Sequence, residues 1–134
     1  MDIQFNEPFE FQLDVVEVDD HVPSLRAHVH INMGIGKSKL IYDDFIWIEC
    51  EVWDRFLKAL RSPPIDPVSL YDMDEHCALS IHRSEQGVVL TWNLLDPYGF
   101  CICQQSMTAL FTAVITEDAH AKIREAFEDF PSWW

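Results

Sequence analysis

The sequence predicts an α+β fold: a mostly antiparallel sheet of five to seven strands, with two helices at about 50–61 and 117–130 packed on one face. Several segments alternate apolar and polar residues, as strands do when they bury one face. Short turns join these segments, which favours antiparallel pairing. Two other segments repeat their apolar residues with the period of a helix, and both follow runs of strands, which is typical of the α+β class.

Three strands are predicted before the first helix, at residues 9–15, 25–33 and 40–48. In the first two of them apolar residues occupy every second position, so one face of each strand is expected to be buried. A turn containing Gly34 and Gly36 joins the second strand to the third. The third strand is expected to be interrupted or bent at Asp43 and Asp44, because two adjacent acids are unusual in a strand.

The first helix is predicted where the strand pattern changes to a helical one. Its apolar residues form one broad stripe: Val52, Trp53, Phe56, Leu57 and Leu60. No Ser, Thr, Asp or Asn stands at an obvious N-cap position, so the first residue of the helix is uncertain by a few positions. Pro63 and Pro64 prevent the helix from continuing.

The second half of the chain begins with a loop at residues 62–75 that is rich in proline and acids. Further strands are predicted at residues 77–82, 88–95 and 100–115, the last being one long strand or two. Thr116 is the expected N-cap of the second helix, and Pro131 ends it. With no internal repeat and no low-complexity segment, residues 1–134 are expected to form a single domain.

The charge of the chain narrows its possible partners. Its 134 residues carry a formal net charge of -14. Nucleic acids and anionic membranes are therefore disfavoured as partners. The N-terminus lacks the positive and apolar regions of a signal peptide, and no apolar stretch approaches the ~20 residues of a membrane span. We therefore expect a cytoplasmic protein.

Neither a metal, a cofactor nor a catalytic residue is predicted. The four cysteines, Cys50, Cys77, Cys101 and Cys103, lie in apolar segments and are expected to be reduced, buried and inert. Cys101 and Cys103 are closer together than the usual pair of zinc ligands. His28 and His30 share one face of a predicted strand, where solvated imidazoles are the simplest interpretation.

Acidic residues form three clusters: Asp14, Glu17, Asp19 and Asp20; Asp43 and Asp44; and Asp72, Asp74 and Glu75. One interpretation is a solvated surface that only keeps the protein soluble. The other is a docking surface for a basic protein, because complementary charge accelerates association. Specific binding also requires aromatic anchors, and the C-terminal Trp133 and Trp134 are candidates.

Several segments together resemble the WapI-like immunity proteins, over about residues 9–131: Phe45-Ile-Trp47, Val52-Trp-Asp-Arg-Phe-Leu57, Leu79-Ser-Ile81, Trp92-Asn-Leu94, Ile123-Arg-Glu-Ala-Phe127 and Phe130-Pro-Ser-Trp133. These are small acidic bacterial α+β proteins that neutralise a secreted or contact-delivered toxin. The resemblance implies a cytoplasmic, non-catalytic protein whose partner is a cognate toxin domain, which we expect to be basic.

Two other kinds of function remain open from the sequence. One is a small ligand-binding module or enzyme whose pocket is lined by Trp47, Trp53 and Trp92. The other is an adaptor subunit that buries Trp133 and Trp134 in a larger assembly. The oligomeric state and the toxin are not specified by the sequence.

Overall fold

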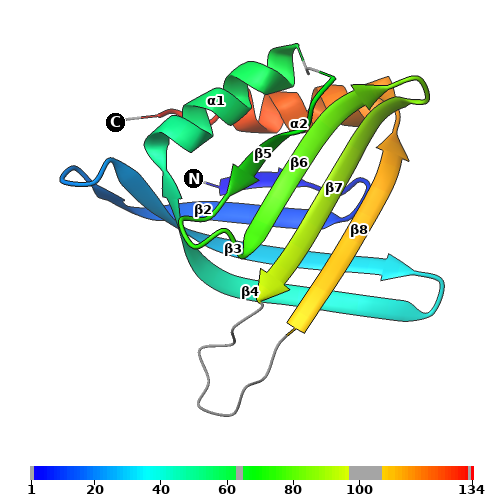
Figure 1. Cartoon of the computed structure of the whole chain (residues 1–134), viewed down its shortest axis with the longest axis horizontal. Helices are drawn as coiled ribbons and strands as arrows, with labels where there is room; N and C mark the ends of the chain where they lie inside the picture. Colours follow the sequence, from blue (N-terminus) through cyan, green and yellow to red (C-terminus); the bar gives the residue numbers. More distant parts are fainter. Residues whose placement is uncertain (1, 63–64, 97–106, 133) are drawn as a thin grey trace.

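The computed structural model describes residues 2–62, 65–96, 107–132 and 134, which form two sheets and two helices (Figure 1). The first sheet has the order β1-β2-β3-β4 and the second the order β5-β6-β7-β8. Every neighbouring pair of strands is antiparallel. The elements are β1 (Asp2–Phe5), β2 (Glu10–Asp19), β3 (Ser24–Ile35), β4 (Ser38–Glu49), α1 (Cys50–Arg61), β5 (Val68–Tyr71), β6 (Cys77–Ser84), β7 (Gly87–Asp96), β8 (Met107–Ile115) and α2 (Glu117–Glu128).

The α+β class and the antiparallel pairing are confirmed, but the predicted single sheet of five to seven strands is wrong. The described residues form eight strands in two four-stranded sheets. The two strands that the sequence did not indicate, β1 and β5, have four residues each, too few to show a clear alternation. The first part of the predicted strand at 100–115 lies outside the described residues.

Strand β4 also corrects a prediction. It pairs with β3 in unbroken register from Ser38 to Glu49, so no interruption occurs at Asp43 and Asp44. Consecutive strand residues point to opposite faces, so two adjacent acids need not disturb the pairing. The irregularity of this sheet lies in β2, where the register shifts between Val15 and Glu17.

The two sheets pack face to face around one core. From the first sheet, alternate residues of β3 point inward and are buried, from Leu25 to Met33. From the second, Trp92 is buried against Tyr42 of β4, with ring centroids 5.5 Å apart. Strands of the two sheets run in clearly different directions, so this is a crossed sandwich rather than one layer with helices above it (Figure 1).

Both helices lie on the same side of the molecule, next to the edge strands of the two sheets. Helix α1 contacts β5, α2 contacts β1, and the helices contact each other (Figure 1). Helix α1 has the predicted bounds, whereas α2 ends at Glu128, two residues before the predicted end. Thr116 is confirmed as the N-cap, its side chain accepting a hydrogen bond from the backbone of Ala119. None of the helices in the described part of the chain is long and apolar enough to cross a membrane.

Helix α2 contains a buried histidine. His120 is 3% exposed, and its Nε2 has no hydrogen-bond partner among the described residues. Burial lowers the pKa of His120, against a weaker opposing effect of the Glu117 carboxylate, while Arg124 and Arg83 lower this pKa further. Folding therefore disfavours the protonated form of this imidazole.

We expect His120→Leu to weaken the pH dependence of stability. Because the unfolded chain takes up a proton at higher pH than the folded one, this histidine lowers the free energy of unfolding as the pH falls below about 6.5. Denaturant unfolding at about pH 7.5 and about pH 5 would measure the effect. His21→Leu is the control, because His21 has a fully exposed side chain (99%). An unchanged pH dependence in His120→Leu would contradict the prediction.

Candidate functional site

The junction between β4 and α1 holds two acidic loops in place through the backbone. The N–H of Cys50 donates to the carbonyl of Pro23, at 2.9 Å, and so fixes the β2–β3 turn. The N–H of Met73 donates to the carbonyl of Trp47, at 2.7 Å, and so fixes the β5–β6 loop. Glu49 is the N-cap but makes no side-chain capping bond, so Pro23 accepts from a helix N–H that would otherwise lack a partner.

These contacts gather acids from three separate segments at one end of the molecule, where the β2–β3 turn, the start of α1 and the β5–β6 loop meet (Figure 1). Together with Asp44 of the neighbouring strand β4, they form a surface that we call the acidic end and define by Asp19, Asp20, Asp44, Glu49, Glu51, Asp54, Asp74 and Glu75. Asp72 of the β5–β6 loop is buried. The closeness of these carboxylates affects Cys50. Burial raises the pKa of its thiol, and the negative charges of Asp54 and Asp20 raise this pKa further.

A groove of about 320 Å³ opens at the acidic end, between β4 and the β5–β6 loop. Its walls combine carboxylates with apolar and aromatic side chains, and neither lysine nor arginine is among its lining residues: Tyr42, Asp44, Phe45, Ile46, Trp47, Asp72, Asp74, His76, Leu94 and Met107. Carboxylates beside aromatic rings form a surface that suits a cationic group, because both attract positive charge.

Asp72 supports the groove from within. Its side chain is 6% exposed, and Oδ1 accepts hydrogen bonds from the backbone N–H groups of His76, at 2.7 Å, and Cys77, at 3.0 Å. The N–H of Asp72 in turn donates to the carbonyl of Cys77, at 3.2 Å. The prediction that Asp72 is an exposed docking residue is therefore wrong: this carboxylate holds the β5–β6 loop closed.

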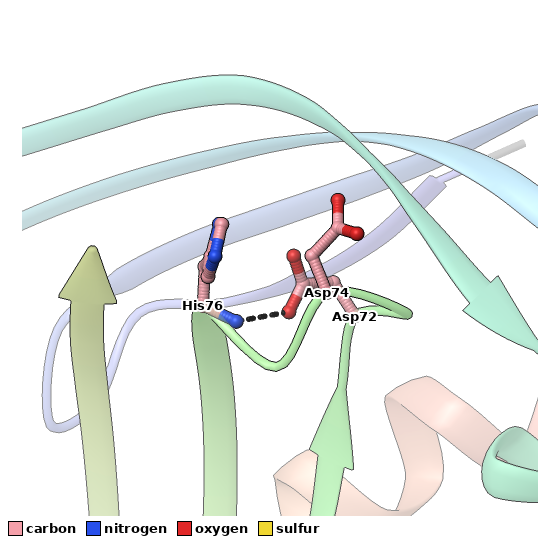
Figure 2. Close-up of side chains that lie close together, drawn as sticks. All are labelled: Asp72, Asp74 and His76. Atoms are coloured by element: carbon pink, nitrogen blue, oxygen red, sulfur yellow. Dashed lines mark hydrogen bonds between the residues drawn. The ribbon is translucent and has the colours of Figure 1, made fainter. Parts of the chain in front are cut away.

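Three side chains of this loop could hold a cation. Asp72, Asp74 and His76 each offer a ligand atom, and these atoms all lie within 4.8 Å of one another. Figure 2 shows their side chains on the same side of the loop. Sequence reasoning missed His76, although it stands at the same two-residue spacing that separates the two aspartates.

The thiols near the groove are poor nucleophiles. Cys77 is buried at the start of β6, and burial raises the pKa of its thiol to about 11, despite an opposing effect of the Trp92 and Tyr42 side chains. Burial also raises the pKa of Tyr42, with a further contribution from Cys77. Cys50 and Cys77 are free thiols, as predicted, whereas Cys101 and Cys103 lie outside the described residues.

Other predicted site residues lie on the outer face of the first sheet, around His28, whose ring packs 4.8 Å from that of the groove residue Phe45. Asp43 accepts hydrogen bonds from both His28, at 2.7 Å, and His30, at 2.8 Å. These bonds, that of His28 first, lower the pKa of Asp43. Asp14 is half-buried opposite His28, and Glu17 lies 3.8 Å from Arg26. The two histidines are thus paired with a carboxylate rather than simply solvated.

The prediction that the C-terminal tryptophans anchor a partner is not supported for Trp134. Its ring is partly buried and packs edge-on against Trp53, with centroids 5.8 Å apart, while its Nε1 donates to Asp54, at 3.4 Å. Trp134 therefore completes the core beneath α1. Trp133 lies outside the described residues.

The tryptophans predicted to line a common pocket are dispersed. Trp53 belongs to α1 and packs beside Phe127, Trp92 lies between the sheets beside Tyr42, and Trp47 is partly exposed at the groove. The groove includes Trp47 but neither of the other two. Sequence reasoning, in turn, did not single out Glu49, Glu51 and Asp54, whose spacing is equally typical of the solvated face of a helix.

Comparison of the chain with family models, curated proteins and solved structures gave no match. The resemblance to the WapI-like immunity proteins stays a prediction from the residues.

Proposed function

We propose that this chain is a non-catalytic, cytoplasmic binding protein that holds a basic protein partner at its acidic end, as an immunity protein holds its toxin. The observation that carries the proposal is the pair of backbone hydrogen bonds that bring three acidic segments together around Trp47 and Cys50. Arg55 of α1 pairs with Glu51 at 3.0 Å, and Arg26 of β3 lies 3.8 Å from Glu17, with its guanidinium 4.6 Å from the centre of the Phe45 ring.

Such a surface favours a basic partner for two physical reasons. Its summed negative potential attracts a cationic domain over a distance and raises the association rate. The edge of the groove then offers apolar contact area, since Phe45 is 49% exposed and Trp47 is partly exposed. The Phe45 ring also packs against His28 and Arg26 on the outer face of the first sheet. Aromatic residues of this kind supply much of the binding energy of protein interfaces. A nuclease toxin would present a matching positive surface, because its groove must hold phosphates.

The test uses the C-terminal domain of the secreted protein encoded next to this chain, when the gene neighbourhood contains one. We expect Asp20→Lys with Asp74→Lys to slow association with that domain by roughly tenfold or more at low salt, because both residues are exposed acids of the acidic end. Stopped-flow or surface-based kinetics at about 50 and about 500 mM salt would measure the rates, and salt should slow the wild-type association strongly.

Glu85→Lys with Glu125→Lys is the matched control. Both positions are exposed, lie on the β6–β7 turn and on α2, and change the net charge by the same amount. We expect this variant to slow association much less than the acidic-end variant does. Equal slowing by the two variants would show that the acidity acts only through net charge. No binding to the neighbouring toxin domain would contradict the proposal itself.

A further inference from the structure

The cluster of Asp72, Asp74 and His76 has the composition and spacing of a metal-ligand set. The three ligand atoms lie within 4.8 Å of one another, a separation that one ion at about 2.0–2.4 Å from each can span. The cluster is built by a closed loop, in which Asp72 and Cys77 are joined through the backbone and Glu75 adopts a left-handed conformation, with φ of 58°. This reversal of the chain lies between Asp74 and His76.

A second observation concerns the free oxygen of Asp72. Oδ1 of this buried carboxylate receives both backbone hydrogen bonds, and Oδ2 accepts none from the described residues. Figure 2 shows this second oxygen directed to the side of the loop where the Asp74 carboxylate and the His76 ring stand. Because Oδ1 is occupied in holding the loop closed, Oδ2 is the oxygen of Asp72 that remains to bind a cation.

We propose that Asp72, Asp74 and His76 bind one divalent transition-metal cation, of the kind represented by Mn²⁺ and Zn²⁺. Two carboxylates and one imidazole suit these ions better than Mg²⁺ or Ca²⁺, which prefer oxygen ligands alone. Three protein ligands leave further coordination positions open toward the groove. The negative charge of Asp44, which lines the same groove, further favours a cation there.

Titration of the chain alone with MnCl₂ and with ZnCl₂ tests this site. We expect one saturable ion per chain by calorimetry, and for Mn²⁺ a loss of the free-ion signal in electron paramagnetic resonance. Asp74→Asn and His76→Gln should each weaken binding by roughly tenfold or more, since each removes a ligand. Asp72 is left unchanged because it also holds the loop closed.

Glu75→Gln is the matched control, because it removes one negative charge from the same loop without removing a ligand of the cluster. We expect it to bind the ion nearly as well as the wild type. An absence of saturable binding, or equal weakening by Glu75→Gln and Asp74→Asn, would overturn the metal site and would show only attraction of cations to an acidic surface. Because no toxin is present, failure here leaves the proposed partner binding to its own test.

Discussion

Replacing Phe127 by alanine is expected to lower the free energy of unfolding by about 3–5 kcal/mol, because a fully buried ring would leave a cavity. Phe127 is 0% exposed and contacts three aromatic rings, of Phe11 in β2 and of Trp53 and Phe56 in α1, with centroids 6.2, 5.7 and 5.2 Å away. This residue thus joins α2 to both the first sheet and the other helix. Its loss should loosen all three elements together.

Chemical denaturation of Phe127→Ala and of the wild type would measure this loss, with Glu125→Ala as the control. Glu125 is exposed on the same helix, and its replacement should change stability by about 0.5 kcal/mol or less. A loss below about 1 kcal/mol in Phe127→Ala would mean that the ring is not packed as described.

Asp72→Ala is expected to lower the free energy of unfolding by about 2–4 kcal/mol, because it removes one charged acceptor and leaves two backbone N–H groups unpaired. The donors are those of His76 and Cys77, at the point where the β5–β6 loop enters β6. The loop should also open, so hydrogen exchange of these two amides should become faster.

Asp74→Ala serves as the control for Asp72→Ala, since Asp74 is exposed in the same loop and carries the same charge. We expect it to change stability by about 0.5 kcal/mol or less in the absence of divalent cations. If both variants had equally small effects, Asp72 would be one more surface acid and its hydrogen bonds would contribute little.

Much of the fold could be predicted because the local signals are strong. The alternation in residues 25–33 and the helical stripe from Val52 to Leu60 specify burial residue by residue, and both elements lie where expected. The division into two sheets could not be predicted. It depends on which strands pair, and the proline-rich loop after α1, with the short β5, gives no local sign that a second sheet begins there.

The candidate site was predictable only in its composition. The acidic clusters are visible in the sequence, but their convergence depends on backbone contacts of Pro23 and Met73, which no side-chain pattern encodes. Asp72 and Asp74 look equivalent in the sequence, yet one is buried and the other exposed. Asp72 is buried because its carboxylate accepts the backbone N–H groups of His76 and Cys77. Trp134 is partly buried because its ring packs against Trp53, a contact between residues far apart in the sequence.

The backbone contacts of the β4–α1 junction also have an evolutionary consequence. Main-chain N–H and carbonyl groups of Pro23, Trp47, Cys50 and Met73 fix the loops, so the exposed side chains of Asp20, Glu51 and Asp74 are not needed for that purpose. Exposed substitutions of this kind usually change stability by about 0.5 kcal/mol or less. For the partner binding proposed above, this means that the exposed acids of the acidic end can be replaced without loss of the fold, so the proposed binding surface can follow changes in a partner.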